Sequence, residues 1–250
     1  MAFPQSEILI QTFSMIYKIL PLLLFFCSTF TANTTGKTEI PKKLIAATSK
    51  SSFEMKVEKI YSSLHSNNLA LPKMESFAKA LEGFYNLKEK GIVKKDILTL
   101  VDFSLSSNTK RLWIIDMSTN TVLYNSLVAH GRNTGEEFAN AFSNANSSFK
   151  SSLGFYATGE VYQGKHGLSL RLDGLEKGLN DNARSRAVVV HGADYVSENF
   201  IKSQGRLGRS QGCPALPVGI TKEVINVIKD KSCLFIYHPS MDKSPSKLLS

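Results

Sequence analysis

From residue 97 onward the sequence is divided into short runs of β-branched and aromatic residues, which are separated by glycine, serine and asparagine. Such runs are typical of strands in a mainly β domain. Ser118, Thr119 and Asn120 separate two of the runs and predict a hairpin turn. We therefore predict a mainly β domain over residues 96–240. Its expected strands are ILTLVDF, RLWIIDM, TVLYNSLVA, GFYATG, LSLRL, RAVVV and CLFIY.

Two amphipathic helices are expected before this domain. Apolar residues recur at helical spacing between residues 53 and 64 and again between residues 74 and 85. Pro72 suits the start of the second helix, and Gly91 suits its end. The sequence thus predicts a small helical N-terminal portion over residues 53–95.

The first residues have the pattern of an export signal. Lys18 precedes an apolar run over residues 19–26, and small polar residues follow. The run is too short to span a bilayer, and the rest of the chain has no segment apolar enough to do so. We interpret residues 1–32 as a signal peptide, with Met15 as an alternative start. The mature protein is then exported to the periplasm or cell envelope without a transmembrane span.

The flanking segments carry less information. Residues 33–52 are rich in Thr, Ser and Lys without an apolar period and are interpreted as a linker, and residues 241–250 as a C-terminal tail. Cys27 is an alternative lipid-attachment site, although the bulky Phe26 before it argues against that role.

The formal net charge is +9 at pH 7, which favours an anionic neighbour. The lysines are dispersed and form no basic arm with interleaved aromatic residues, so nucleic acid is not an expected partner. In an exported protein this charge indicates peripheral contact with an anionic envelope. A solvated basic surface without a partner is the alternative interpretation.

After signal removal the chain keeps two cysteines, Cys213 and Cys233. Export permits a disulfide between them. Against a bridge, Cys233 lies in CLFIY, which is typical of a buried strand, and free cysteine is among the most buried residue types. We predict that both thiols are free.

Cys213 lies in the segment SQGCP. A thiol is nucleophilic only as a thiolate, and acyl transfer also needs backbone N–H groups that face the developing oxyanion. Gly212 has the conformational freedom to direct such groups, whereas Pro214 has no N–H to donate. The oxyanion donors are therefore expected on the Gly212 side, from Gly212 and Cys213. A glycine–proline turn around a buried cysteine is the alternative.

A catalytic thiol needs a base, and the sequence has five histidines. Three of them precede a glycine: His130, His166 and His191. His191 ends the run VVV, and rigid elements position catalytic groups better than loops do. We therefore predict His191 as the base, His130 as a structural rival and His166 as a substrate-binding residue. The sequence contains no HxxxH or CxxC spacing, so neither a metal nor a cofactor is expected.

The ordered segments SSLGFY, VVVHGAD and GRSQGC resemble the murein L,D-transpeptidase catalytic domain over residues 97–238. The resemblance implies a β-sandwich catalytic domain and a cysteine acyl-enzyme. It assigns Cys213 as nucleophile and His191 as base, with Gly212 and Ser210 in the cysteine loop. The chain departs from the family, as a divergent branch, at Gln211, where a second histidine is usual, and after the cysteine, where an arginine is usual.

Other residues near these motifs are assigned to the substrate. Arg209 is expected to replace the missing arginine as the contact for a substrate carboxylate, with Arg206 as an alternative. Gln211 and Gly192 are also predicted to bind substrate. Asp194 is a candidate for orienting the histidine.

These expectations define a function class. The chain is predicted to be an exported L,D-transpeptidase that acts on peptidoglycan stem peptides through a cysteine thioester. An L,D-carboxypeptidase differs only in passing the thioester to water instead of an amine. A non-catalytic wall-binding module that uses the same cleft is the third interpretation.

Overall fold

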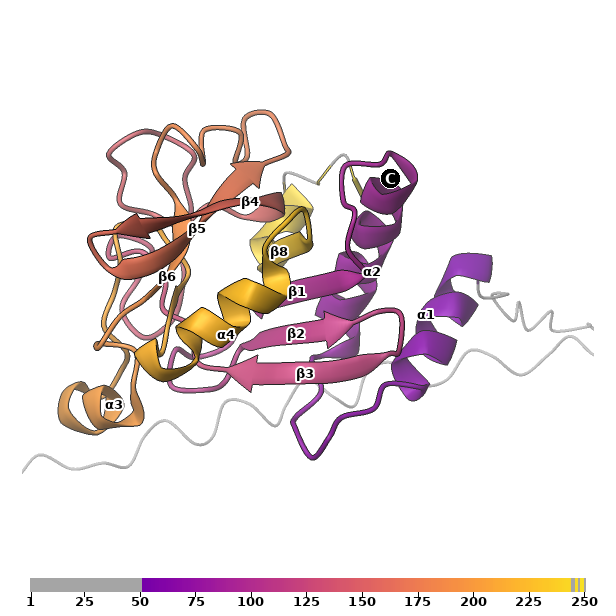
Figure 1. The fold of residues 1–250 in the computed structure, drawn as a ribbon, viewed down its shortest axis with the longest axis horizontal. Helices are drawn as coiled ribbons and strands as arrows, with labels where there is room; N and C mark the ends of the chain where they lie inside the picture. The colour runs from indigo at the N-terminus through magenta and orange to yellow at the C-terminus, as the bar shows by residue number, and fades with distance from the viewer. Residues whose placement is uncertain (1–50, 244–245, 247, 250) are drawn as a thin grey trace, which may run out of the picture. The chain divides into compact units, whose positions relative to one another are not determined.

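In the computed structural model, residues 51–243, 246, 248 and 249 are described. The predicted signal peptide, Cys27 and most of the predicted linker lie outside these residues. The described part begins with two helices, which are followed by the strands and two further helices (Figure 1). The elements are α1 (Ser52–Ser62), α2 (Met74–Glu89), β1 (Ile97–Asp102), β2 (Leu112–Asp116), β3 (Thr121–Ser126), β4 (Gly154–Gly164), β5 (Gly167–Gly174), β6 (Val189–Gly192), α3 (Glu198–Gln204), β7 (Ala215–Leu216), α4 (Val218–Ile228), β8 (Cys233–Tyr237) and a 3₁₀ turn (Pro239–Lys243).

The two predicted N-terminal helices are present. Ser51 caps α1 in a capping box with Glu54, which satisfies backbone N–H groups that have no partner inside the helix. Helix α2 begins at Met74, two residues after Pro72, and Gly91 follows its end with φ +67°. A left-handed residue at this place is a common helix terminator.

The strands of the described residues form one eight-stranded sheet in the order β3-β2-β1-β8-β4-β5-β6-β7. Strand β1 pairs in parallel with β8, and β6 pairs in parallel with β7, while the other neighbours are antiparallel. The prediction of a mainly β fold behind a small helical portion is confirmed. The β4–β5 hairpin is longer than the two short strands that the sequence predicts there.

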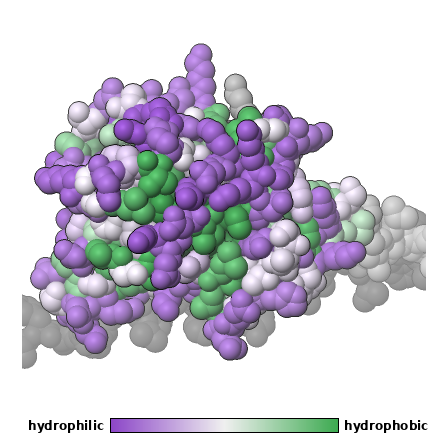
Figure 2. Space-filling view, in the orientation of Figure 1, coloured by the Kyte–Doolittle hydropathy of each residue, from purple (hydrophilic) through white to green (hydrophobic). Residues whose placement is uncertain are grey.

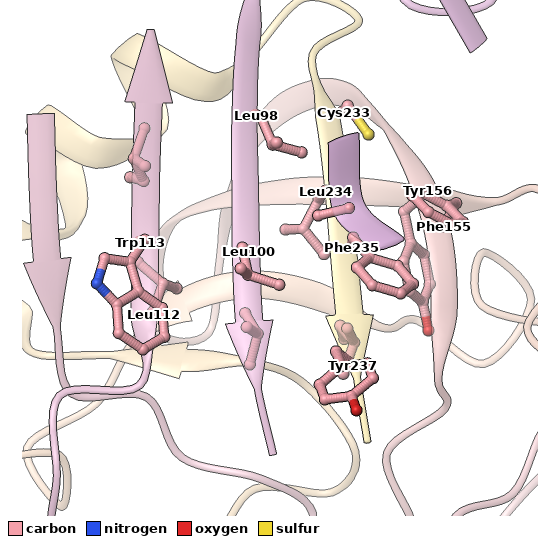
Figure 3. Close-up of a cluster of buried hydrophobic side chains, with 14 of the residues drawn as sticks. Leu98, Leu100, Leu112, Trp113, Phe155, Tyr156, Cys233, Leu234, Phe235 and Tyr237 are labelled. Atoms are coloured by element: carbon pink, nitrogen blue, oxygen red, sulfur yellow. The ribbon is translucent and has the colours of Figure 1, made fainter. Parts of the chain in front are cut away.

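The core lies at the centre of this sheet. Figure 3 shows Phe155 of β4 beside Phe235 of β8, and their rings stack with centroids 4.0 Å apart. Helix α2 approaches the sheet closely at Gly83, because a Cβ there would lie 2.0 Å from the Phe155 ring. Helix α4 crosses in front of the sheet in Figure 1 and contacts β6, β5 and β1. This packing fixes the end of β6, where His191 lies.

Candidate active site

Cys213 precedes the short strand β7, which runs parallel to β6. The register pairs His191 with Ala215 and Gly192 with Leu216. Cys213 lies two residues before Ala215, outside the strand, and its sulfur contacts the Val189 N–H of β6. Cys213 and His191, the residues that the sequence predicts as nucleophile and base, line the same cavity.

The Cys213 sulfur lies against the backbone that leads into β6. The Val189 N–H donates to Sγ at 3.4 Å, and the thiol donates to the Ala187 carbonyl at 3.7 Å. Burial raises the pKa of the Cys213 thiol, while the Val189 N–H and the charge of Arg186 act in the opposite direction. Ala187 has φ +54°, a left-handed conformation that costs a residue with a Cβ about 1–2 kcal/mol.

Cys213 and Cys233 are both free. Cys233 is fully buried in β8, and burial raises the pKa of its thiol far above the usual value. The half-buried Cys213 is therefore the thiol that a reagent can reach.

The loop before β7 is organised by Ser210. Its hydroxyl donates to the Cys213 carbonyl at 2.7 Å and accepts the Gly212 N–H at 3.0 Å. The second contact differs from the expectation that Gly212 supplies an oxyanion donor, because a serine hydroxyl two residues earlier takes that N–H. In the described part of the chain, the Cys213 N–H has no acceptor and remains available.

The glycine after His130 supports the same loop. A Cβ on Gly131 would lie 2.9 Å from the Gly212 Cα and 2.6 Å from the Phe149 carbonyl oxygen. Ser151 links the two segments, since its hydroxyl accepts the Gly131 N–H at 3.0 Å and donates to the Gly212 carbonyl at 3.1 Å. The first His-Gly pair therefore contributes to the site through its glycine.

His191 is 3% exposed at the end of β6. Its Nδ1 lies 2.8 Å from the Gly192 carbonyl oxygen and must donate to it, which leaves Nε2 unprotonated in the neutral ring. The carbonyl fills the orienting role for which Asp194 is the sequence candidate. Burial and the neighbouring His166 lower the pKa of His191, so the ring is neutral and able to accept a proton at pH 7.

His166 lies in the turn between β4 and β5. Its ring stacks on that of His191, with centroids 4.6 Å apart and an interplanar angle of 24°. The residue predicted to bind substrate is thus also a direct neighbour of the predicted base.

His130 is 1% exposed and is held on both nitrogens. The Arg111 guanidinium donates to Nδ1 at 2.7 Å, and Nε2 donates to the Gly135 carbonyl at 3.2 Å. Burial and the Arg111 charge lower the pKa of His130 to about 4. These contacts leave His130 without a free nitrogen, as expected for a structural residue.

The residues assigned to substrate contacts lie in different places. Arg209 faces the cavity, but its guanidinium donates to the Gly135 carbonyl at 3.2 Å and to Glu136 at 2.6 Å. Gln211 is exposed at the cavity rim. Gly192 instead packs against α4, since a Cβ there would lie 2.9 Å from the Thr221 hydroxyl. Close helix packing, not substrate contact, explains that glycine.

Cys213, His191 and His166 line one cavity of about 810 Å³. Most of its lining residues are not among those that the sequence singles out, and Arg186 and Tyr195 are two of them. Arg186 lies five residues before His191, just ahead of β6, and that proximity is the available signal. The cavity is lined by Asn146, Ser147, Phe149, Tyr162, Lys165, His166, Ser169, Ser185, Arg186, Ala187, Val189, His191, Tyr195, Arg209, Ser210, Gln211 and Cys213.

Two classes of feature are absent from the described part of the chain. It contains no group of three or more His, Cys, Asp or Glu side chains placed to hold a metal ion. None of its helices is both long and apolar enough to cross a membrane.

Residues 68–237 match the family model of the L,D-transpeptidase catalytic domain, which is more than half of the chain. The protein therefore belongs to this family. No curated protein matches the chain.

Solved structures of L,D-transpeptidases are also similar. LdtMt1 in complex with imipenem shares 12% identity at a TM-score of 0.36, with 57% of this chain and 59% of that chain covered. An enzyme from Mycobacterium smegmatis shares 13% identity at a TM-score of 0.35, with 57% and 59% covered. One from Xylanimonas cellulosilytica shares 10% identity at a TM-score of 0.34, with 73% and 92% covered. The chain thus spans less than two thirds of the first two structures.

Proposed function

We propose that this protein is an exported L,D-transpeptidase that acts on peptidoglycan stem peptides through a thioester on Cys213. The observation that carries the proposal is that Cys213 and His191 line one cavity of an L,D-transpeptidase catalytic domain, with His191 on β6 and Cys213 just before the parallel strand β7. Export is supported by the signal pattern of residues 1–32. The same cavity would also serve hydrolysis, in which water instead of an amine accepts the acyl group. The reaction product therefore identifies the acceptor.

In the proposed mechanism, Nε2 of His191 takes the proton of the Cys213 thiol, and the thiolate attacks the carbonyl carbon of the scissile peptide bond. The carbonyl oxygen becomes an oxyanion, which the free Cys213 N–H stabilises. When the intermediate collapses, the C–N bond breaks, and the imidazolium returns its proton to the departing amine. A thioester remains, and D-Ala leaves.

The second half-reaction transfers the acyl group. An amine of a neighbouring stem peptide attacks the thioester carbon, His191 accepts the proton of that amine, and the C–S bond breaks. The sulfur leaves as a thiolate and recovers the proton from His191. If water enters instead of the amine, the product is a free carboxylate and the enzyme is an L,D-carboxypeptidase.

The proposal is tested by the intact mass of the protein after incubation with imipenem, the compound bound in the LdtMt1 structure. We expect one covalent adduct on wild type and on Cys233→Ala, and none on Cys213→Ala. Cys233→Ala is the matched control because its thiol is buried in β8. An adduct that persists in Cys213→Ala contradicts the assignment, and no adduct on folded wild type supports a non-catalytic wall-binding module. Adding a stem peptide with and without an amine acceptor then separates aminolysis from hydrolysis.

A further inference from the structure

Arg186 is half-buried between the cysteine loop and the serine-rich segment 143–152. Its Nη1 donates to the Ser143 carbonyl at 2.9 Å and to the Ser152 hydroxyl. Its Nη2 donates to the Lys150 carbonyl at 2.6 Å and to the Ser148 hydroxyl at 3.2 Å. Every one of these acceptors is neutral. The guanidinium is therefore well hydrogen-bonded but not charge-compensated.

Arg184, two residues earlier, has the opposite environment. It donates to Glu160 at 2.8 Å and forms an ion pair with Asp173 on the exposed surface. Among the described residues, no carboxylate forms an ion pair with Arg186. A partly desolvated cation without a counter-ion favours an anion nearby.

Two titratable groups near Arg186 can become anions, the Tyr156 phenol and the Cys213 thiol. Tyr156 is fully buried, and burial raises its pKa far above the usual value, so it stays neutral. Cys213 is the remaining candidate. The Arg186 Nη2 lies 3.4 Å from the point where a Cβ on Gly212 would be, so the guanidinium packs directly against the cysteine loop.

The other titratable side chains of the cavity are placed differently. His191 and His166 are stacked on one another, and Arg209 is paired with Glu136. Tyr162, Lys165 and Tyr195 complete the set of titratable groups around the cavity.

We propose that Arg186 is a positioning residue whose charge stabilises the Cys213 thiolate, while its hydrogen bonds to the 143–152 segment hold the guanidinium beside the cysteine loop. The inference rests on the proposed function of Cys213 as a nucleophile. This chain has Pro214 and Ala215 after the cysteine, where an arginine is usual in the family. Arg186 would supply a positive charge near the thiol from another segment. It also gives the serine-rich segment a role, because its hydroxyls and carbonyls fix the orientation of the guanidinium.

The test measures the rate of Cys213 alkylation by iodoacetamide against pH in the full-length chain, with the modified cysteine identified by peptide mass. Because an adjacent opposite charge lowers a pKa by about one unit or more, Arg186→Gln should react about tenfold more slowly than wild type at pH 7. Its rate should rise to the wild-type plateau at high pH. Arg186→Lys keeps the charge and should recover most of the rate. Arg184→Gln, the matched control, should leave the profile unchanged.

The readouts separate charge from structure. Cys233 stays unmodified only while the fold is intact, so its protection identifies variants that remain folded. An Arg186→Gln profile that coincides with wild type overturns the proposal, and so do Gln and Lys variants that lose reactivity equally. If wild type forms no imipenem adduct while Arg186→Gln still shifts the alkylation profile, the proposed function fails and the role of Arg186 in the thiol's ionisation stands.

Discussion

The imidazole of His191 uses Nδ1 on the Gly192 carbonyl and carries His166 on one ring face. Only the unprotonated Nε2 is able to take a proton from Cys213. A general base contributes about 10²–10⁴-fold to a rate, so His191→Ala should lose that much in imipenem acylation at pH 7. The loss should shrink at high pH, where the thiol ionises without a base. A stopped-flow acylation rate measured across pH checks both parts.

His166→Ala supplies the companion measurement. His166 lowers the pKa of His191, so its removal should raise that pKa. The base works only when deprotonated, and the rate therefore falls as pH drops through the pKa of His191. The acid limb of the acylation profile should accordingly move to higher pH in His166→Ala. A limb that moves to lower pH contradicts the influence of the stacked ring on the base.

Sequence patterns identify the residues with distinctive local chemistry and overlook the others. Cys213 and His191 are recognisable because SQGCP and VVVHG are unusual segments that also resemble a known family. The sequence does not show whether the Gly212 N–H faces the substrate oxyanion or a neighbouring side chain. In the structure it donates to the Ser210 hydroxyl. Arg186 is overlooked because its partners are backbone carbonyls and hydroxyls, which leave no charge pattern in the sequence.

Gly192 is a different case, because the contact that requires a glycine there comes from a distant part of the chain. The expectation of a substrate contact rests on its place beside His191. In the structure its neighbour is Thr221 of α4, which lies 29 residues later in the chain. Only the three-dimensional packing of α4 on β6 reveals that contact.

At the scale of elements, the apolar pattern locates the first two helices and every strand of the sheet except β7, but it does not predict how the strands pair. The parallel pairs β1–β8 and β6–β7 join segments that are far apart in sequence or separated by α3, and no local pattern specifies them. Helix α3 escapes prediction because its seven residues include no buried side chain and so show no amphipathic period. Its capping residue, Ser197, is the local signal that remains.

The contact between β6 and α4 leads to a prediction about Gly192. A Cβ there would lie 2.9 Å from the Thr221 hydroxyl and 3.4 Å from the Val218 Cα, so alanine should force α4 away from the strand. Overpacking of this kind costs about 1–3 kcal/mol, and we expect Gly192→Ala to lower the free energy of unfolding by that amount in urea titrations.

Gly219→Ala is the matched control for this contact. Gly219 lies in α4, and a Cβ there meets nothing within 4 Å. Alanine should leave the stability unchanged or raise it by about 0.5–1 kcal/mol, because a helical glycine gives up more backbone entropy. Equal losses in the two variants would show that the β6–α4 contact is not the cause.

At the scale of the whole molecule, ionisable groups are unevenly distributed between surface and interior. Figure 2 shows one face on which hydrophilic residues separate small apolar areas. The ion pairs of Glu160 and Glu136 are exposed, and exposed pairs contribute little to stability. The buried pair of Arg111 and His130 differs, because both partners are removed from water.

His130 should therefore make the stability of the fold depend on pH. Its pKa is about 4 in the folded protein, where burial and Arg111 disfavour the imidazolium, and about 6.5 in an unfolded chain. As the pH drops, the unfolded state binds the proton first. The stability that neutral His130 contributes to the fold is therefore full above pH 6.5 and is lost as the pH falls toward 4. The loss amounts to about 3 kcal/mol.

His130→Gln removes this titration while keeping an acceptor for Arg111 and a donor for the Gly135 carbonyl. We expect the variant to be less stable at pH 7, because an amide matches the two contacts less well than the ring. The difference between the two proteins should narrow as pH falls from 6.5 to 4, since only wild type loses the contribution of a neutral His130. Urea titrations at several pH values measure it, and the carboxylates shared by both proteins cancel in the comparison. Parallel stability curves for wild type and variant would show that His130 takes up its proton equally well in the folded and unfolded states.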